Sequence, residues 1–319
     1  MKNNSYNIES LRKIIRELQK ENRILRKKLN EYDKTLLIDD IDKEKLEEND
    51  NYDLDQGGRI INRYITNKMV LGFFSLFRDR KDVYAKRASN GGYYPQCENR
   101  WNDNCPINCG KEKICSKDCA FKKYQELTGN TLLKHFIGYK EDRSDVIGIY
   151  TTLIDNTCRF LAFDFDDHKE KDDKWIRETK EFVEVCKENN LDVLVERSSS
   201  GNGSHVWVFF REAIKVPLAR MFGNLLIDKC LDSIKISSFE YYDRMYLSQD
   251  SSNGLGSLIA LPLQGRAVKN GNSCFVDENF NAYEDQWDVI LNKVTRYSEK
   301  QIREYITTLQ AQFAEEEGN

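Results

Sequence analysis

The order of strand and helix patterns beyond residue 145 constrains the fold of this chain most strongly. Two β-rich runs flank Asp155-Asn156, a dipeptide typical of a tight hairpin turn, and helical and strand patterns then alternate. The predicted strands are 146–154, 157–166, 191–196, 205–210, 239–243 and 257–263, and the predicted helices are 172–190 and 217–231. This order predicts an α+β fold in which a sheet is layered on helices.

The N-terminal region, residues 1–37, carries a heptad repeat. Apolar residues occupy most of both seam positions over residues 8–32, and Asn22 is the polar residue at the first of them. A lone Asn in the seam favours a parallel two-stranded coiled coil, so we expect a homodimer through this segment. The other reading is an amphipathic helix that docks on its own domain. Residues 38–58 are acidic and predict a solvated linker.

The composition excludes several classes of protein. With a net charge of −4, the chain does not resemble a protein that coats nucleic acid by bulk electrostatics. The 16 Phe, 16 Tyr and 4 Trp residues can build a core although charged residues make up 32%. No apolar run approaches the length of about 20 residues that spans a membrane, and no secretion signal begins the chain. We therefore expect a cytoplasmic protein without a membrane partner.

Cysteines crowd into one short segment. The chain has nine of them, an odd number that does not favour a disulfide framework, and five lie between residues 97 and 119. This crowding predicts a structural zinc site rather than free thiols. The expected ligands are Cys97, Cys105, Cys115 and Cys119, with Cys109 as the alternative ligand.

Two aspartates end the apolar run that starts at Phe160. Strand alternation places Asp164 and Asp166 on one face, with α-carbons roughly 7 Å apart, a span that divalent ions bridge. The simpler reading is that these acids only end a strand and meet solvent. Their mutual repulsion favours a cation between them.

Further polar residues follow along the chain. His205 comes directly after a Ser-Gly-Asn-Gly-Ser loop that can approach phosphate oxygens, and we expect its strand to adjoin the strand of Asp164. On its own, such a loop is better explained as a glycine-rich hairpin with a surface His. Asp243 or Asp250 offers a third acid. A loop suited to phosphate or template contacts follows the strand 257–263.

Three motifs together resemble those of the archaeo-eukaryotic primase superfamily. They are Phe163-Asp164-Phe165-Asp166, the segment 200–207 with His205, and an Asp followed by Leu-Ile-Ala-Leu-Pro-Leu-Gln at 258–264. Additional segments resemble the primase domain of TOTE conflict systems and of the related CRISPR-associated primase-polymerases. These segments are 76–85, 94–97, 196–198 and 271–277, and the similarity covers about residues 68 to 290.

The resemblance implies a catalytic palm of RRM-like topology over 146–289. A second αβ module with the zinc-binding loop would occupy 59–145, and a C-terminal helix with an acidic tail would occupy 290–319. It further implies Mg²⁺ or Mn²⁺ ions that Asp164, Asp166 and Asp243 hold as catalytic metal ligands. The residues expected to bind the nucleotide are Ser198, Ser200, Ser204, His205, Arg266 and Lys269.

The expected activity is template-directed joining of NTPs or dNTPs on single-stranded or primed DNA. The last cysteine pair departs from the family, because its spacing is Cys-x3-Cys where relatives commonly show Cys-x2-Cys. The helicase that often follows in TOTE proteins is not in this sequence, so a separately encoded helicase or defence-system protein is the expected partner. The alternative function is a non-catalytic, zinc-bearing DNA-binding adaptor of a mobile-element or defence system. A metal-dependent nuclease is a third reading, which would use the same acids together with a nearby Lys or a further acid on a helix.

Overall fold

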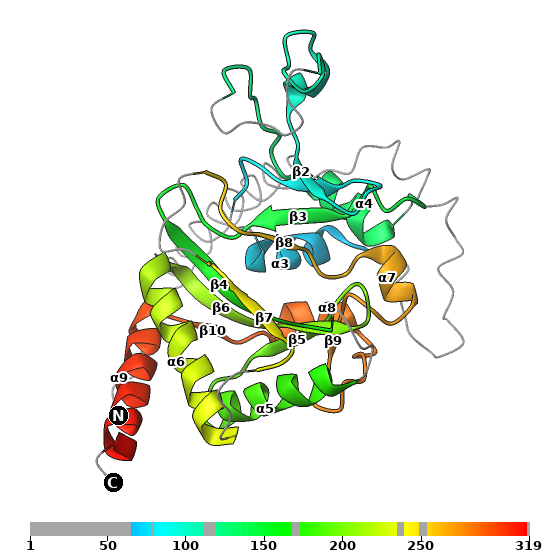
Figure 1. Cartoon of the computed structure of the whole chain (residues 1–319). Helices are drawn as coiled ribbons and strands as arrows, with labels where there is room; N and C mark the ends of the chain where they lie inside the picture. The colour runs from blue at the N-terminus through cyan, green and yellow to red at the C-terminus, as the bar shows by residue number, and fades with distance from the viewer. Residues whose placement is uncertain are drawn as a thin grey trace, which may run out of the picture.

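A computed structural model describes residues 65–77, 80–110, 119–138, 140–167, 173–234, 239–248 and 254–317. The predicted coiled coil, the acidic linker, Cys115 and Asp250 lie outside these residues. Within the described ranges, two β-sheets and several helices are arranged in layers (Figure 1).

The larger sheet has six strands and contains the run that ends in the two aspartates. Its order is β7 (Tyr242–Tyr246), β4 (Thr157–Asp166), β6 (Gly203–Lys215), β5 (Leu194–Arg197) and β9 (Cys274–Val276), with β10 (Arg296–Tyr297) paired to β6. Every neighbouring pair is antiparallel except β10 with β6. The expected strand pair around the glycine loop is found as β5 and β6.

Helices cover one face of this sheet. They are α5 (Lys174–Glu188), α6 (Val216–Ile234) and α9 (Glu299–Glu317), and Figure 1 shows them along the same side. Strand alternation explains the contact, because Phe163 and Phe165 of β4 join the core that these helices cover. Phe182 of α5 lies 4.6 Å from Phe163 between ring centroids. Within the described chain, no helix is long and apolar enough to cross a membrane.

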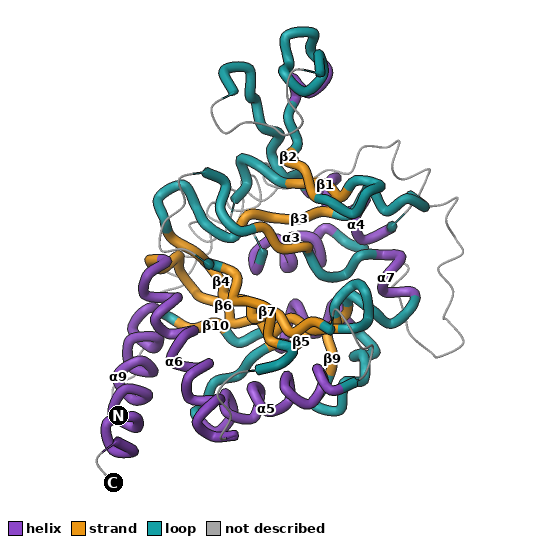
Figure 2. The backbone as a smooth tube through the Cα atoms, viewed as in Figure 1, coloured by secondary structure: helices purple, strands orange, loops and turns teal. Residues whose placement is uncertain are grey.

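The opposite face of β4 packs toward a second, four-stranded sheet. That sheet has the order β2 (Tyr93–Pro95), β1 (Ala85–Arg87), β3 (Ile147–Tyr150) and β8 (Leu258–Ala260). Helix α3 (Asn67–Leu76) lies between the two sheets (Figure 2), beside α4 (Gly129–Ile137). Phe160 and Ala162 contribute to this second core, so Asp164, next in the alternation, lies at the end of that face.

The remaining elements are short. Two helices, α7 (Gly265–Lys269) and α8 (Gln286–Asp288), flank β9 in the sequence. A 3₁₀ turn, η1 (Glu98–Trp101), starts the cysteine-bearing extension that rises from the end of β2 (Figure 1), and a π-helical turn, η2 (Val289–Lys293), follows α8.

The structure corrects three sequence-based expectations. The predicted hairpin of 146–154 with 157–166 is wrong, because β3 pairs with β1 and β8 while β4 belongs to the other sheet. The turn itself forms, with Asn156 at a φ of 61°, but the chain leaves the first sheet after residue 150. Similarly, β8 joins the small sheet, which therefore combines strands from the two segments expected as separate modules. The C-terminal helix starts at Glu299 rather than near residue 290, since η2 and β10 intervene.

Candidate active site

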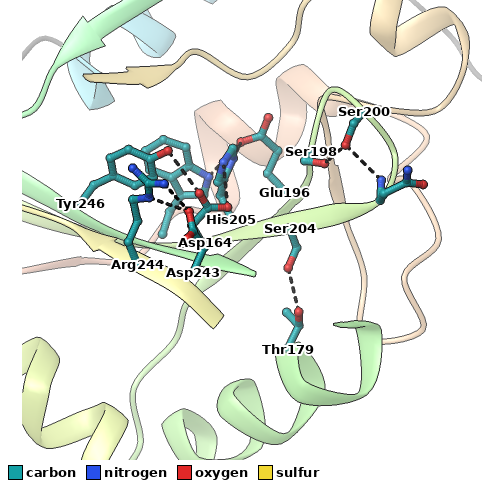
Figure 3. A network of polar contacts seen from close by, with 12 residues as sticks. Asp164, Thr179, Glu196, Ser198, Ser200, Ser204, His205, Asp243, Arg244 and Tyr246 are labelled. Carbon is teal, nitrogen blue, oxygen red and sulfur yellow. Dashed lines mark hydrogen bonds and ion pairs between the residues drawn. The ribbon is translucent and has the colours of Figure 1, made fainter. Parts of the chain in front are cut away.

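Three side chains form a row across the middle of the larger sheet. Asp164 of β4 lies directly opposite His205 of β6, and His205 lies directly opposite Glu196 of β5. Directly opposed residues of antiparallel strands share a face, which here is the face toward the small sheet. The expectation that the strand of His205 adjoins that of Asp164 is met by this pairing. Figure 3 shows the three side chains close together.

His205 lies between two carboxylates. Its Nδ1 is 3.0 Å from Oε2 of Glu196, and its Nε2 is 3.6 Å from Oδ1 of Asp164. Burial disfavours the charged ring, but the adjacent Glu196, followed by Asp164 and Asp166, outweighs burial and raises the pKa of His205 to about 9. At neutral pH the ring is therefore an imidazolium with a proton on each nitrogen.

Glu196 holds the histidine in place and was not among the expected site residues. Its side chain is only 2% exposed, and besides His205 it accepts a 3.1 Å hydrogen bond from Nε1 of Trp207. The Ser273 hydroxyl donates to its other oxygen at 3.4 Å. The sequence does contain a signal for this role, because in a hairpin closed by the loop 198–202 the register sets residue 196 opposite residue 205.

A β-bulge brings Asp243 to the same region. The register of β4 with β7 shifts between Asp164–Arg244 and Phe165–Tyr242, so Asp243 is the extra residue on its strand. Nε of Arg244 donates to Oδ2 of Asp243 at 2.6 Å. The structure thus places the expected third acid beside Asp164 (Figure 3), but in an ion pair with its own neighbour.

Tyr246 also binds Asp164. Its hydroxyl donates to Oδ2 of Asp164 at 3.2 Å. Burial and the adjacent Asp164 raise the pKa of the Tyr246 phenol, so this group stays protonated. Asp164 therefore has Tyr246 at one oxygen and His205 near the other.

Asp166 lies two residues along the same face and opposite Gly203. A Cβ at position 203 would lie 2.4 Å from the carbonyl oxygen of Phe165 and 3.0 Å from Oδ1 of Asp166. Only glycine leaves room for this close pairing of β4 and β6. Gly203 thus allows the strands of Asp166 and His205 to pair closely.

The serines of the glycine loop do not all reach this face. The hydroxyls of Ser198 and Ser200 are 2.9 Å apart, and the second accepts from the Asn202 N–H at 3.2 Å, so both stabilise the loop itself. Ser204 points to the helix-covered side, where its hydroxyl lies 2.8 Å from that of Thr179 on α5 (Figure 3). The structure does not bring the Ser204 side chain together with the acids, because neighbouring residues of a strand face opposite ways.

Comparison with known proteins identifies the family. The sequence profile described as "TOTE conflict system, Archaeo-Eukaryotic Primase domain" matches residues 68–305. The chain belongs to this family. The resemblance inferred from the motifs is thereby confirmed. No curated protein matches the chain significantly.

Several solved structures are similar to the chain. One of them is described as "Polymerase Domain from Mycobacterium tuberculosis Ligase D in complex with DNA". The two share 10% sequence identity, and the alignment covers 76% of this chain and 86% of that one, with a TM-score of 0.37. The family assignment rests on the sequence profile.

Residues of this primase domain offer carboxylate oxygens, the ligands that suit Mg²⁺ and Mn²⁺. Asp164, Asp166 and the bulged Asp243 fit such an ion by their donor chemistry. In the part of the chain that is described, however, no three His, Cys, Asp or Glu side chains are close enough to hold a metal together. Arg244 contacts Oδ2 of Asp243, and no hydrogen bond or ion pair to the described residues involves Oδ1 of this carboxylate.

The expected zinc site of the primase domain is only partly described. Cys97 and Cys119 are half-buried, Cys105 is buried and Cys109 is exposed. The Lys123 N–H lies 3.3 Å from Sγ of Cys97. Because Cys115 falls outside the described residues, the zinc site stays a prediction.

Arg266 and Lys269 lie on α7, directly after Gln264. The backbone N–H of Gln264 donates to the Ser273 hydroxyl at 3.2 Å, and that hydroxyl contacts Glu196. The helix that carries these two cations is thus linked to the row through two hydrogen bonds.

Proposed function

We propose that this chain is a nucleotidyltransferase that joins NTPs or dNTPs on a DNA template, as a primase, a polymerase or both. The observation that carries the proposal is the row of Asp164, His205 and Glu196, in which a protonated imidazole lies beside a strand-end carboxylate. Phosphoryl transfer needs mainly positioning and charge stabilisation, and this row supplies both kinds of group. Membership of the primase family supports the same reaction class.

In this proposal His205 binds the triphosphate of the incoming nucleotide. Glu196 occupies Nδ1, so Nε2 is the nitrogen that points toward substrate. The 3.6 Å separation of Nε2 from Asp164 exceeds a normal hydrogen bond, which leaves that N–H able to donate to a phosphate oxygen. The hydrogen bonds from Trp207 and Ser273 keep Glu196, and through it the imidazole, in one orientation.

Asp164, Asp166 and Asp243 are the residues that would hold the divalent ions. Such ions activate the attacking hydroxyl and stabilise the charge that develops on the leaving pyrophosphate. Tyr246 orients the carboxylate of Asp164 by its hydrogen bond. Arg244 neutralises Oδ2 of Asp243, so this carboxylate would bind a metal ion through Oδ1.

Incorporation of labelled nucleotides tests the proposal. The purified protein is incubated with NTPs or dNTPs, single-stranded or primed DNA and Mn²⁺, and products are resolved on a gel. Asp164→Ala and Asp166→Ala should abolish extension, whereas Asp288→Ala, which removes an exposed carboxylate on α8, should not. Extension at the wild-type level by both active-site variants would overturn the assignment, and DNA binding without any incorporation would favour an adaptor.

Two further parts of the proposal concern assembly. A homodimer through residues 8–32 should disappear in light scattering when residues 1–35 are removed. A structural zinc ion held by four of the five clustered cysteines should give one zinc per chain in metal analysis. Each result stands apart from the extension assay.

A further inference from the structure

Two arginines lie side by side on the small sheet. Arg87 ends β1 and Arg143 precedes β3, and the backbone of Val146 connects them. The Arg87 N–H donates to the Val146 carbonyl at 3.0 Å, and the Val146 N–H donates to the Arg143 carbonyl at 3.2 Å. Both side chains are half-buried.

Neither guanidinium group is in contact with a carboxylate of the described residues. Within the described residues, neither forms an ion pair within 4.0 Å, in contrast to Arg80, which pairs with Asp82 at 2.6 Å. Arg143 instead donates to the neutral amide oxygen of Gln264 at 2.6 Å. The carboxylate that acts on Arg143 from a greater distance is that of Asp145, which accepts from the Lys140 N–H at 3.1 Å.

Repulsion among cations marks this part of the surface. Burial and then the charge of Arg87 lower the pKa of Arg143. Crowded like charges in a half-buried position cost stability, and an anion bound between them removes that cost.

Arg143 also has an unusual backbone. Its φ of 59° is in the left-handed region, which a residue with a Cβ seldom adopts. This conformation coincides with the hydrogen bond from its side chain to Gln264. Strain of this kind is found at sites where a side chain must be held in a fixed direction.

The arginines adjoin the proposed active site. Tyr93 lies directly opposite Arg87 in the pairing of β1 with β2. Burial raises the pKa of the Tyr93 phenol to about 12, with Arg143 and Arg87 opposing the rise and Glu196 adding to it, so the phenol interacts with the charges of both arginines and of Glu196. Gln264, the partner of Arg143, connects to Glu196 through Ser273.

We propose that Arg87 and Arg143 form a binding site for a phosphate group at the edge of the active site. Paired guanidinium groups suit phosphate because each presents a planar fork of donors. The phosphate belongs to the backbone of a nucleic-acid strand or to a nucleoside triphosphate, and the two sources share this chemistry. The inference goes beyond the proposed catalytic function, since anion binding does not depend on nucleotide incorporation.

The test measures two ligands with one set of variants. A labelled single-stranded oligodeoxynucleotide reports nucleic-acid binding by fluorescence anisotropy, and inorganic tripolyphosphate reports triphosphate binding by its effect on the melting temperature. The variants are Arg87→Ala, Arg87→Lys and Arg143→Lys in the full chain. Lys300→Ala is the control, since it removes a cation that is exposed on α9.

Arg87→Ala should weaken at least one ligand by about tenfold, and the lysine variants should lose about threefold because they keep charge without the fork. A nucleic-acid source would also make the salt dependence of oligonucleotide binding shallower by about 0.7 per lost contact. A tripolyphosphate effect alone would identify the nucleotide. Equal binding of both ligands by Arg87→Ala and Lys300→Ala would overturn the site.

Two further measurements separate loss of the anion site from loss of the fold and from loss of catalysis. Without anion, Arg87→Ala should melt at the wild-type temperature or above it, because it removes a repelling charge; if that variant does not fold, Arg87→Lys carries the test. Asp164→Ala should keep full anion binding. Loss of extension with intact anion binding would mean that the proposed catalysis fails. Loss of anion binding with intact extension would mean that this site fails, so the two failures are distinguishable.

Discussion

Two histidines with little exposed surface occupy two different regions of this molecule, His135 fully buried and His205 with 12% of its side chain exposed. His135 lies on α4 beneath the small sheet, where its Nε2 donates to the Pro262 carbonyl at 2.9 Å and its Nδ1 accepts from the Ile147 N–H at 3.0 Å. Its partners are neutral backbone groups. Burial therefore dominates and lowers the pKa of His135 to about 4.

His205 is similarly withdrawn from water, but its partners are carboxylates. Glu196 and Asp164 raise its pKa to about 9 against the effect of burial. The comparison shows that burial alone does not distinguish a structural histidine from a functional one. The charge of the neighbouring groups does, because it decides whether the ring can carry a proton to an anionic substrate.

The same substitution in both regions should give the largest contrast. His205→Gln keeps an amide that can bond to Glu196 but removes the cation, so nucleotide incorporation should fall by roughly 10²–10³-fold. His135→Gln should leave incorporation per folded molecule unchanged. Steady-state assays normalised to the folded fraction measure both, and equal losses in the two variants would break the comparison.

The free energy of unfolding should depend on His135 between pH 6.5 and pH 4. Below pH 6.5 the unfolded chain binds a proton that the folded chain refuses until about pH 4, so stability falls as the pH falls through this window. The loss from this residue should be roughly 3 kcal/mol. Urea unfolding at several pH values measures it.

His135→Gln is the control for that pH series. It should flatten the dependence between pH 6.5 and pH 4, because the titrating group is gone. A slope as steep as in the wild type would show that other groups cause the acid lability.

Glu196→Gln sharpens the role of the carboxylate behind His205. The amide retains an acceptor for His205 and Trp207 but loses the charge, so we expect an about tenfold rise in the KM for nucleotide with a smaller change in kcat. Trp207→Phe removes another donor to Glu196 and serves as the matched control. An unchanged KM in Glu196→Gln would argue that the charge of Glu196 does not act through His205.

Ser204→Ala should have the smallest effect on activity. Its hydroxyl bonds to Thr179 on the helix-covered face, so the KM for nucleotide should stay within about twofold while stability falls by about 1 kcal/mol. Steady-state kinetics and urea unfolding of the same preparation test this. A large rise in KM would instead return Ser204 to the nucleotide site.

Strand periodicity predicted much of the candidate site. The alternation in residues 160–166 placed Asp164 and Asp166 on one face, and the loop before His205 predicted the strand pair that the structure contains. Both inferences involve neighbours in the chain, for which side-chain direction follows from the two-residue repeat. The Ser204 expectation ignored that same repeat, which turns its hydroxyl away from His205.

Other features depend on contacts between distant segments. The bulge at Asp243 arises from a register shift against β4, and Arg143 meets Gln264 across 121 residues of chain. The sheet to which β3 and β8 belong was also predicted wrongly, because both strands have the apolar pattern of any buried strand. An apolar strand pattern indicates that the strand pairs with another strand, but it does not identify that neighbouring strand.

By itself the sequence determined the strands and helices, the common face of the two aspartates and the family to which the chain belongs. Tertiary structure alone decided that Glu196 also binds Trp207 and Ser273, that Asp243 is paired with Arg244, and that Arg87 and Arg143 adjoin the row without an ion pair to any described residue. The physical reason is the range of the forces involved. Periodicity acts over a few residues of one strand, whereas charge and burial depend on groups that only folding brings together.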